Sequence, residues 1–198
     1  MGSSTRYKES PSQTAGPYVH IGCTPNFVDV QGVYSADLGV GPNADFDGNL
    51  RGADMSGERI TITGKIYDGA GSLVTDAMVE TWQTDAQGQY PAADAAFSGW
   101  ARQACDLTTG VFTFQTIKPG CIATSTDRQS PHVSIWIVAR GINLGLHTRI
   151  YFADEDNSAD PVLALIEPAR RQTLIASQTG GAYVFNVRLQ GENETVFF

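Results

Sequence analysis

Three histidines are the residues of this chain best suited to metal or acid–base chemistry: His20, His132 and His147. His132 and Ser134 stand two residues apart in an apolar run that predicts a β-strand, so their side chains share one face. A second histidine at position 134 would complete a two-imidazole metal chelate, but this position is serine, so only one imidazole is present. We therefore favour a hydrogen-bonded histidine at a strand edge over a metal ligand for His132.

Motifs for other chemistries are weak or absent. No serine stands in a G-x-S-x-G elbow, which argues against a hydrolase. The glycines in 69–71 join two predicted strands, whereas a nucleotide-binding loop opens a helix. The acidic run 154–156 lacks the spacing and the glycine of an EF-hand, so we interpret it as a solvated turn. Tyr18 and His20 follow Pro17, and we favour packing over metal binding there.

Arg140 directly follows an apolar run, 135–139, that predicts a strand. Its guanidinium would therefore project from the rim of the sheet. A guanidinium at such a place can bind a carboxylate through two parallel hydrogen bonds. The alternative is a surface salt bridge, worth about 0 to 1 kcal/mol, and the residues alone favour that alternative.

The elements that must position these residues are mostly strands. Short β-branched and aromatic runs separated by turn residues predict a mainly β fold of the sandwich or barrel type. The predicted strands span 59–67, 73–82, 111–117, 132–139, 146–152 and 183–189. One short helical segment is predicted where Asp160 can cap and Pro161 can open a helix. Pro168 should interrupt this helix, which is expected to resume over 170–176.

The length of 198 residues fits a single domain with a sizeable core. All the predicted strands fall within 59–198, which we assign as the sandwich core. Over 1–58, repeated glycines break any hydrophobic period. We therefore expect 1–58 to form an arm and loops of the kind that wrap a partner chain.

The charge balance disfavours several classes of partner. The 21 acidic and 13 basic side chains give a formal net charge of −8, and no basic run is present. Nucleic-acid and membrane-surface binding are therefore not expected. The longest apolar runs are far shorter than the about 18 residues of a membrane span, and 1–8 has no signal-peptide core. Cys23, Cys105 and Cys121 lack metal-ligand spacing, so we expect free thiols in a reducing cytoplasm.

Several longer segments resemble one family. They are residues 11–22, 116–120, 139–143, 146–152 and the C-terminal block 190–198. Together they resemble the intradiol ring-cleaving dioxygenases, and among these the α chains of members built from two kinds of chain. The resemblance implies a β-sandwich and a non-haem ferric ion that binds an ortho-diphenol as its dianion. It also implies that the ion is held in the β chain, by two tyrosines and two histidines.

The ligand positions of the family are degenerate in this chain. By the resemblance, the two tyrosine ligands match Tyr90 and Ile122, and the histidine pair matches His132 and Ser134. The arginine that stabilises the charge of the bound substrate matches Gln129. Ferric iron needs anionic oxygen donors and a filled coordination sphere. We therefore expect no metal in this chain, and Fe(III) bound by the partner β chain.

The resemblance gives the chain a different part in the site. It implies that Thr14, Gly16, Pro17 and Arg140 line the substrate pocket of the partner chain across the subunit interface. There the Arg140 cation would offset the ring carboxylate of protocatechuate, and Thr14 would make one hydrogen bond to that carboxylate. Gly16 and Pro17 would allow close backbone approach at a fixed angle. The salt-bridge interpretation of Arg140 thus becomes the less favoured one.

The expected function is a subunit of an iron-dependent enzyme that is inactive alone. The enzyme would cleave protocatechuate with O2 to 3-carboxy-cis,cis-muconate, in the β-ketoadipate pathway of aromatic catabolism. The chain would join its β chain in a higher-order hetero-oligomer. Two alternatives stay open: a structural β-sandwich subunit without a role in substrate binding, and a self-sufficient dioxygenase with an altered iron site based on Tyr90 and His132.

Overall fold

Strands form most of the regular structure in the computed structural model, which describes residues 14–16, 23–24, 56–91 and 97–198. The strands are β1 (Arg59–Tyr67), β2 (Met78–Gln83), β3 (Trp100–Ala104), β4 (Val111–Ile117), β5 (Ile122–Ala123), β6 (Arg128–Gln129), β7 (His132–Val138), β8 (Leu146–Phe152), β9 (Ile175–Thr179), β10 (Ala182–Val184) and β11 (Val187–Arg188). The helical segments are α2 (Pro161–Ala164), α3 (Pro168–Arg171) and the 3-10 helix η1 (Gln172–Leu174). The predicted mainly β fold is confirmed.

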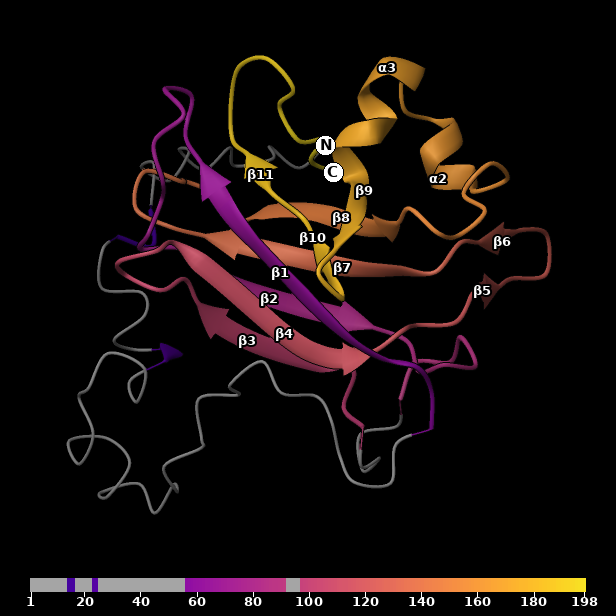
Figure 1. Cartoon of the computed structure of the whole chain (residues 1–198). Coiled ribbons are helices and arrows are strands. Elements are labelled where there is room, and N and C mark those ends of the chain that lie inside the picture. The colour runs from indigo at the N-terminus through magenta and orange to yellow at the C-terminus, as the bar shows by residue number, and fades with distance from the viewer. Residues whose placement is uncertain (1–13, 17–22, 25–55, 92–96) are drawn as a thin grey trace, which may run out of the picture.

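A nine-stranded sheet folds back on itself into two layers (Figure 1). One layer has the strand order β8-β7-β2-β3, and the other contains β4, β1 and β10. Strand β9 joins the layers, because its residues 175–176 pair with β8 and its residues 177–179 pair with β10. Strands β5 and β6 form a separate two-stranded ribbon that precedes β7 in the chain.

Apolar side chains from alternate strand positions fill the space between the layers. On β1, Ile60, Ile62 and Ile66 are buried, while Thr61 and Tyr67 are partly exposed. They belong to one buried cluster with Val79 of β2 and Ile135 of β7. Burying one such side chain contributes about 1.5 to 3 kcal/mol, so this cluster holds the two layers together.

The strand predictions are confirmed for most of the sheet. The bounds of β1, β4 and β8 match the predicted ones, and β7 ends one residue earlier. The predicted strand 73–82 begins only at Met78, since Leu73 makes no more than an isolated bridge to Tyr67. The predicted strand 183–189 is divided into β10 and β11, which pair with different parts of β1. Strands β3, β5, β6 and β9 were not predicted.

The helical prediction is correct at its start and wrong at its end. The Asp160 carboxylate accepts hydrogen bonds from two backbone N–H groups in the first turn of α2, as expected of a cap. Pro168 opens α3 instead of interrupting a helix, so there are two short α-helices among the described residues. The expected helix over 170–176 ends before Ile175, because Ile175 and Ala176 pair in parallel with β8.

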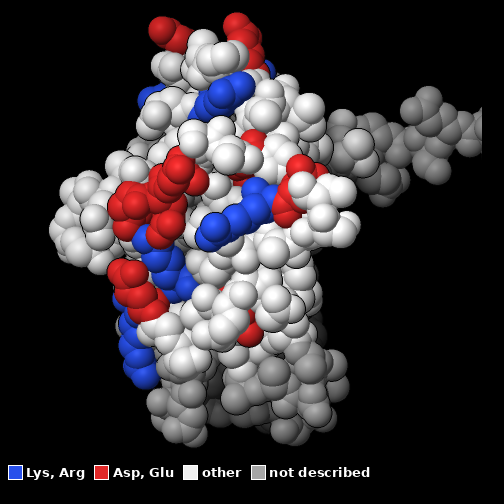
Figure 2. Space-filling model, turned by 90° about the vertical axis from the view of Figure 1, so that its right-hand side faces the viewer, with Lys and Arg blue, Asp and Glu red and all other residues white. Residues whose placement is uncertain are grey.

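The surface agrees with the charge pattern of the sequence. Figure 2 shows Lys and Arg side chains intermixed with Asp and Glu on one face of the molecule, with no broad basic field there. Within the described part of the chain, no helix is long and apolar enough to cross a membrane. Most of the predicted arm, including Pro17, Tyr18 and His20, lies outside the described residues, so the division at residue 58 stays a prediction.

Candidate functional site

Arg140 lies in the turn that follows β7 and precedes β8. The backbone N–H of Ile142 donates to the carbonyl oxygen of Ala139 at 3.2 Å and closes the turn. Gly141 has a φ of +83°, the left-handed conformation that a type II turn requires at its third position. The turn carries the Arg140 side chain away from the sheet, where it is 70% exposed.

Thr14 contacts the backbone on both sides of Arg140. Its Oγ1 donates to the carbonyl oxygen of Ala139 at 3.3 Å and accepts from the backbone N–H of Gly141 at 3.1 Å. It also accepts from the N–H of Gly16 at 3.4 Å. A hydroxyl has one hydrogen and two lone pairs, so these contacts use all of them. The predicted hydrogen bond from Thr14 to a substrate carboxylate stays a prediction, because here the hydroxyl serves the chain's own backbone.

Asp76, in the turn before β2, approaches the same arginine. Its Oδ2 lies 3.2 Å from Nε of Arg140, and the carboxylate side chain is only 13% exposed. Oδ2 accepts no hydrogen bond within the described residues, so the ion pair is its one polar contact there. Asp76 also acts on Cys105: burial first, and this carboxylate second, raise the pKa of the thiol to about 12. Cys105 is therefore an uncharged, unreactive thiol at neutral pH.

A pocket of about 580 Å³ lies beside this arginine. Arg140, Asp76 and Asp68 provide its charged groups, and Leu73, Leu144 and Leu146 contribute apolar walls. A volume of this size is sufficient for a small aromatic ligand. The structure places Thr14 and Gly16 beside the turn that carries Arg140, and Pro17 falls outside the described residues. Their role in lining a substrate pocket stays a prediction.

Only two of the four degenerate ligand positions carry a tyrosine or histidine side chain. Tyr90 is 49% exposed and its ring stacks on Trp82, with the ring centroids 6.2 Å apart. Ile122 on β5 and Ser134 on β7 bring no anionic donor. Within the described residues, no group of three or more His, Cys, Asp or Glu side chains could hold a metal ion.

His132 is the fourth of these positions and is buried, with 4% exposure. Its Nδ1 hydrogen bonds with the carbonyl oxygen of Ser130 at 2.8 Å, and its ring lies 5.6 Å from the ring of Tyr151. Desolvation by burial lowers the pKa of His132, so the imidazole is neutral at pH 7. This is the hydrogen-bonded histidine favoured from the sequence.

Polar residues next to His132 satisfy one another. The Tyr151 hydroxyl donates to Oδ1 of Asp160 at 3.2 Å, and the backbone N–H of Ser130 donates to Oδ2 of Asp160 at 2.9 Å. Arg149 donates from Nη1 to Oε1 of Gln129 at 2.9 Å. Gln129, which by the resemblance matches the position of the family's arginine, is therefore engaged by a residue of its own chain.

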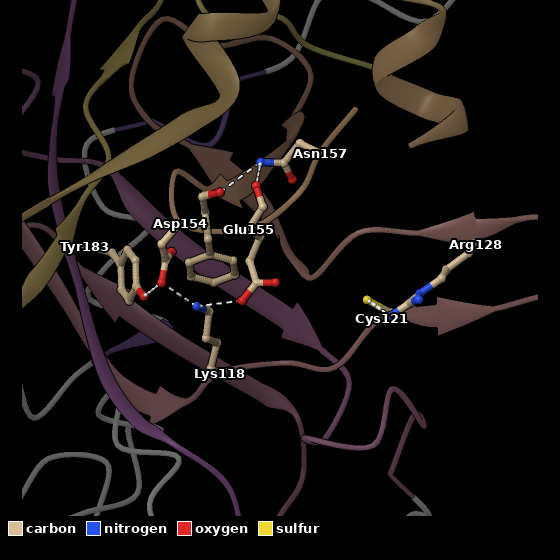
Figure 3. A network of polar contacts seen from close by, with 8 residues as sticks. Lys118, Cys121, Arg128, Asp154, Glu155, Asn157 and Tyr183 are labelled. Carbon is tan, nitrogen blue, oxygen red and sulfur yellow. Dashed lines mark hydrogen bonds and ion pairs between the residues drawn. The ribbon is translucent and has the colours of Figure 1, made fainter. Parts of the chain in front are cut away.

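A second polar network joins the end of β4 to the loop after β8 (Figure 3). Nζ of Lys118 lies 2.6 Å from Oδ2 of Asp154 and 2.7 Å from Oε1 of Glu155, and the Tyr183 hydroxyl donates to the same Asp154 oxygen. Burial acts to lower the pKa of Lys118, but its hydrogen bonds to the two carboxylates outweigh that effect and raise it. Residues 154–156 do form a turn at the surface, as expected, but Asp154 and Glu155 both pair with a lysine, which was not expected.

Asp76, Arg149 and Lys118 are polar residues whose roles sequence reasoning missed. Asp76 stands alone between Thr75 and Ala77, without a recognisable motif. It lies inside the run 73–82, which predicts a strand, so no local pattern indicated a turn there. Their partners lie 20 to 64 positions away in the sequence, which no local pattern reveals.

Comparison with known proteins adds independent findings. The sequence profile of a family described as Dioxygenase matches residues 33–191. The α chain of protocatechuate 3,4-dioxygenase from Pseudomonas putida is 44% identical over 96% of each chain. The β chain from Burkholderia cepacia is 29% identical, over 74% of this chain and 70% of its own length.

Solved structures share the fold at low sequence identity. An intradiol ring-cleavage dioxygenase from Tetranychus urticae has a TM-score of 0.56 and 18% identity, over 71% of this chain and 84% of its own. Catechol 1,2-dioxygenase from Pseudomonas arvilla C-1 has a TM-score of 0.55 and 19% identity, over 72% of this chain and 55% of its own.

Proposed function

The chain belongs to the intradiol ring-cleaving dioxygenase family, and on that premise we propose that it is the iron-free α chain of a protocatechuate 3,4-dioxygenase. The complete enzyme would insert both atoms of O2 between the hydroxylated carbons of protocatechuate and yield 3-carboxy-cis,cis-muconate. The family uses iron, and a β-type partner would hold the Fe(III). Three unpaired cysteines fit a cytoplasmic location.

The residues of this chain do not fit iron. Of the four ligand positions only Tyr90 and His132 keep a suitable side chain. Tyr90 is stacked on Trp82, and Nδ1 of His132 is hydrogen bonded within the chain. We therefore derive no step of ring cleavage from this chain's own residues, and assign it substrate binding and assembly.

The observation that carries the proposal is the contact of Thr14 with the backbone on both sides of Arg140, more than 120 positions later, where Arg140 lines a pocket. Arg140 keeps most of its guanidinium exposed there. A guanidinium beside a pocket with leucine walls suits an aromatic acid, because it can neutralise the carboxylate while the ring contacts the leucines. Pro17 belongs to the same proposed lining.

Assembly with a β-type chain is supported by exposed aromatic side chains. Trp82 is 46% exposed, Tyr90 stacks on it, and Trp100 and Trp136 line a hollow of about 220 Å³ on the same layer. Aromatic residues are enriched at protein interfaces. The β chain from Burkholderia cepacia aligns with 74% of this chain, so the proposed partner is a related chain.

The direct test compares the purified chain alone with the chain co-purified with a β-type partner. We expect the isolated chain to contain no iron, to be colourless and to be inactive, and the complex to cleave protocatechuate. Visible absorption from ferric tyrosinate, or turnover, in the isolated chain would instead support the self-sufficient enzyme.

A second test addresses substrate binding by Arg140. In the complex, Arg140→Ala should raise the KM for protocatechuate at least about tenfold, the effect of losing a charged hydrogen bond. An unchanged KM would favour the structural subunit without a role in substrate binding.

A further inference from the structure

Arg140 poses a positioning problem. Its side chain is 70% exposed and is carried by a turn, so in isolation it would sample many rotamers. An arginine that binds a carboxylate through two parallel hydrogen bonds must present a fixed edge. The structure contains two contacts that reduce this freedom, one on the backbone and one on the side chain.

The backbone contact comes from Thr14. Its single hydroxyl bonds both the carbonyl oxygen before Arg140 and the N–H after it, and so spans the residue. The turn is also closed by its own hydrogen bond between Ile142 and Ala139. These bonds set the direction in which the Arg140 side chain leaves the backbone.

The side-chain contact comes from Asp76, which pairs with Nε. Arg140 has no other ion pair and no side-chain hydrogen bond within the described residues, so both Nη groups stay available at the outer edge. Other turn aspartates of the chain behave differently. Asp68, Asp85 and Asp106 accept hydrogen bonds from backbone N–H groups of their own turns. Oδ2 of Asp76 accepts no such hydrogen bond within the described residues. Stabilisation of its own turn therefore does not account for the position of this oxygen beside Arg140.

We infer that Asp76 and Thr14 are positioning residues, which hold Arg140 so that its Nη edge meets the carboxylate of an aromatic acid in the adjoining pocket. Neither residue then needs to touch the substrate. The inference rests on the proposed role of Arg140. It assigns a task to Asp76, and it gives Thr14 a task other than contact with the substrate.

Two effects of Asp76 oppose each other, and the test must separate them. Its negative charge weakens the attraction of Arg140 for an anion, whereas its ion pair fixes the guanidinium. Asp76→Asn removes the charge but keeps an oxygen that can accept from Nε. Asp76→Ala removes both. If positioning is the dominant effect, alanine should impair binding and asparagine should restore most of it.

The experiment measures KM and kcat in the complex with the β-type chain for protocatechuate and for catechol, which lacks the carboxylate. Asp76→Ala should raise the KM for protocatechuate about fivefold with kcat within about twofold, and leave the KM for catechol within about twofold. Asp76→Asn should stay within about twofold of the parent for both substrates. Asp156→Asn, the same change at an exposed turn aspartate, is the matched control and should change neither KM.

Thr14 is tested in the same way. Thr14→Val removes the hydroxyl at nearly constant shape and should raise the KM for protocatechuate about threefold or more, whereas Thr14→Ser keeps the hydroxyl and should not. In an Arg140→Ala background, Asp76→Ala and Thr14→Val should each add less than about twofold, because their effects pass through the arginine.

Three results would overturn the inference. The first is a KM for protocatechuate that Asp76→Ala leaves unchanged or lowers. The second is an equal rise in KM for protocatechuate and for catechol. The third is an effect of Asp76→Ala on KM that is as large in the Arg140→Ala background as in the parent. The proposed function fails separately, when Arg140→Ala itself leaves the KM for protocatechuate unchanged. If Arg140→Ala weakens binding and Asp76→Ala does not, only the inference about positioning falls.

Discussion

Polar side chains near the start of β7 form hydrogen bonds with one another, whereas the arginine beyond its end keeps N–H donors without a hydrogen-bond partner among the described residues. We call the group His132, Arg149, Tyr151 and Asp160 the closed end, and the group Thr14, Asp76 and Arg140 the open end. Asp160 is 1% exposed and accepts four hydrogen bonds, while Arg140 is 70% exposed and has one ion pair.

This difference separates stability from recognition. A buried polar group that has all its partners rigidifies the core, and losing one partner costs the full desolvation of the other. Free donors beside a pocket contribute little to folding but can bind a ligand. We therefore expect substitutions at the closed end to change stability, and substitutions at the open end to change affinity.

The largest effect is expected for Asp160→Ala at the closed end. It leaves the Tyr151 hydroxyl and three backbone N–H groups without their acceptor, which should cost about 3 to 5 kcal/mol of unfolding free energy. Urea unfolding of the purified protein measures this loss. Asp156→Ala is the control, since among the described residues the side chain of that exposed aspartate bonds only Ser158 in its own turn, and the loss of stability should be much smaller. An equal loss of unfolding free energy in the two variants would show that the burial of Asp160 does not determine its contribution to stability.

Next in size is Lys118→Met in the network of Figure 3. The lysine side chain is 11% exposed and pairs with two carboxylates, so its loss should cost about 2 kcal/mol. Thermal unfolding provides the measurement. Lys65→Met on β1 is a suitable control, because Lys65 forms no ion pair within the described residues. A Lys118→Met protein as stable as the control would contradict the prediction.

A smaller effect concerns pH. Burial lowers the pKa of His132 in the folded chain, whereas the unfolded chain takes up its proton near pH 6.5. The stability contributed by neutral His132 is therefore complete above about pH 6.5 and is lost as the pH falls toward the folded pKa, by up to about 1.4 kcal/mol per pH unit. His132→Gln should reduce the difference in unfolding free energy between pH 7.5 and 5.5, as measured by urea unfolding at the two pH values. Identical pH dependence in the parent and His132→Gln would contradict the assignment.

The smallest effect on stability is expected for Arg140→Ala at the open end. Its ion pair is largely exposed on the arginine side, and removing the arginine side chain lets water reach Oδ2 of Asp76, so the unfolding free energy should fall by less than about 1 kcal/mol. The same preparation should show the increase in KM proposed above. A large loss of stability would remove the contrast between the two ends.

The sequence predicted the regular part of the sheet well, for a physical reason. In β1 and β4, buried and partly exposed residues largely alternate, and such a period of two is visible without a structure. Strand β3 reads Trp-Ala-Arg-Gln-Ala, with small and polar residues that hide its alternation. Strand β9 is polar and mostly exposed, and its identity is set by pairing with β8 and β10. Such tertiary pairing overrides local preference.

The candidate site was less accessible from local patterns. The residues around Arg140 alone favoured a surface salt bridge, and the structure does contain one, with Asp76. The link between Thr14 and Arg140 came from family resemblance, because no periodicity connects positions so far apart. Asp76 gave no signal at all. Its role depends on the fold bringing the turn before β2 beside the turn after β7.

The pairing of β1 with β10 has a consequence for how the chain is made. Ile62 of β1 pairs with Tyr183 of β10, 121 positions later. At a synthesis rate of about 5 to 20 residues per second, β1 waits about 6 to 24 s after its own translation before its neighbour exists. Strand β4 can cover one edge of β1 during that time, but among the described strands the other edge pairs only with β10 and β11, which are synthesised near the end of the chain. Protection of this nascent edge, by a chaperone or by the growing chain itself, is therefore part of producing the folded subunit.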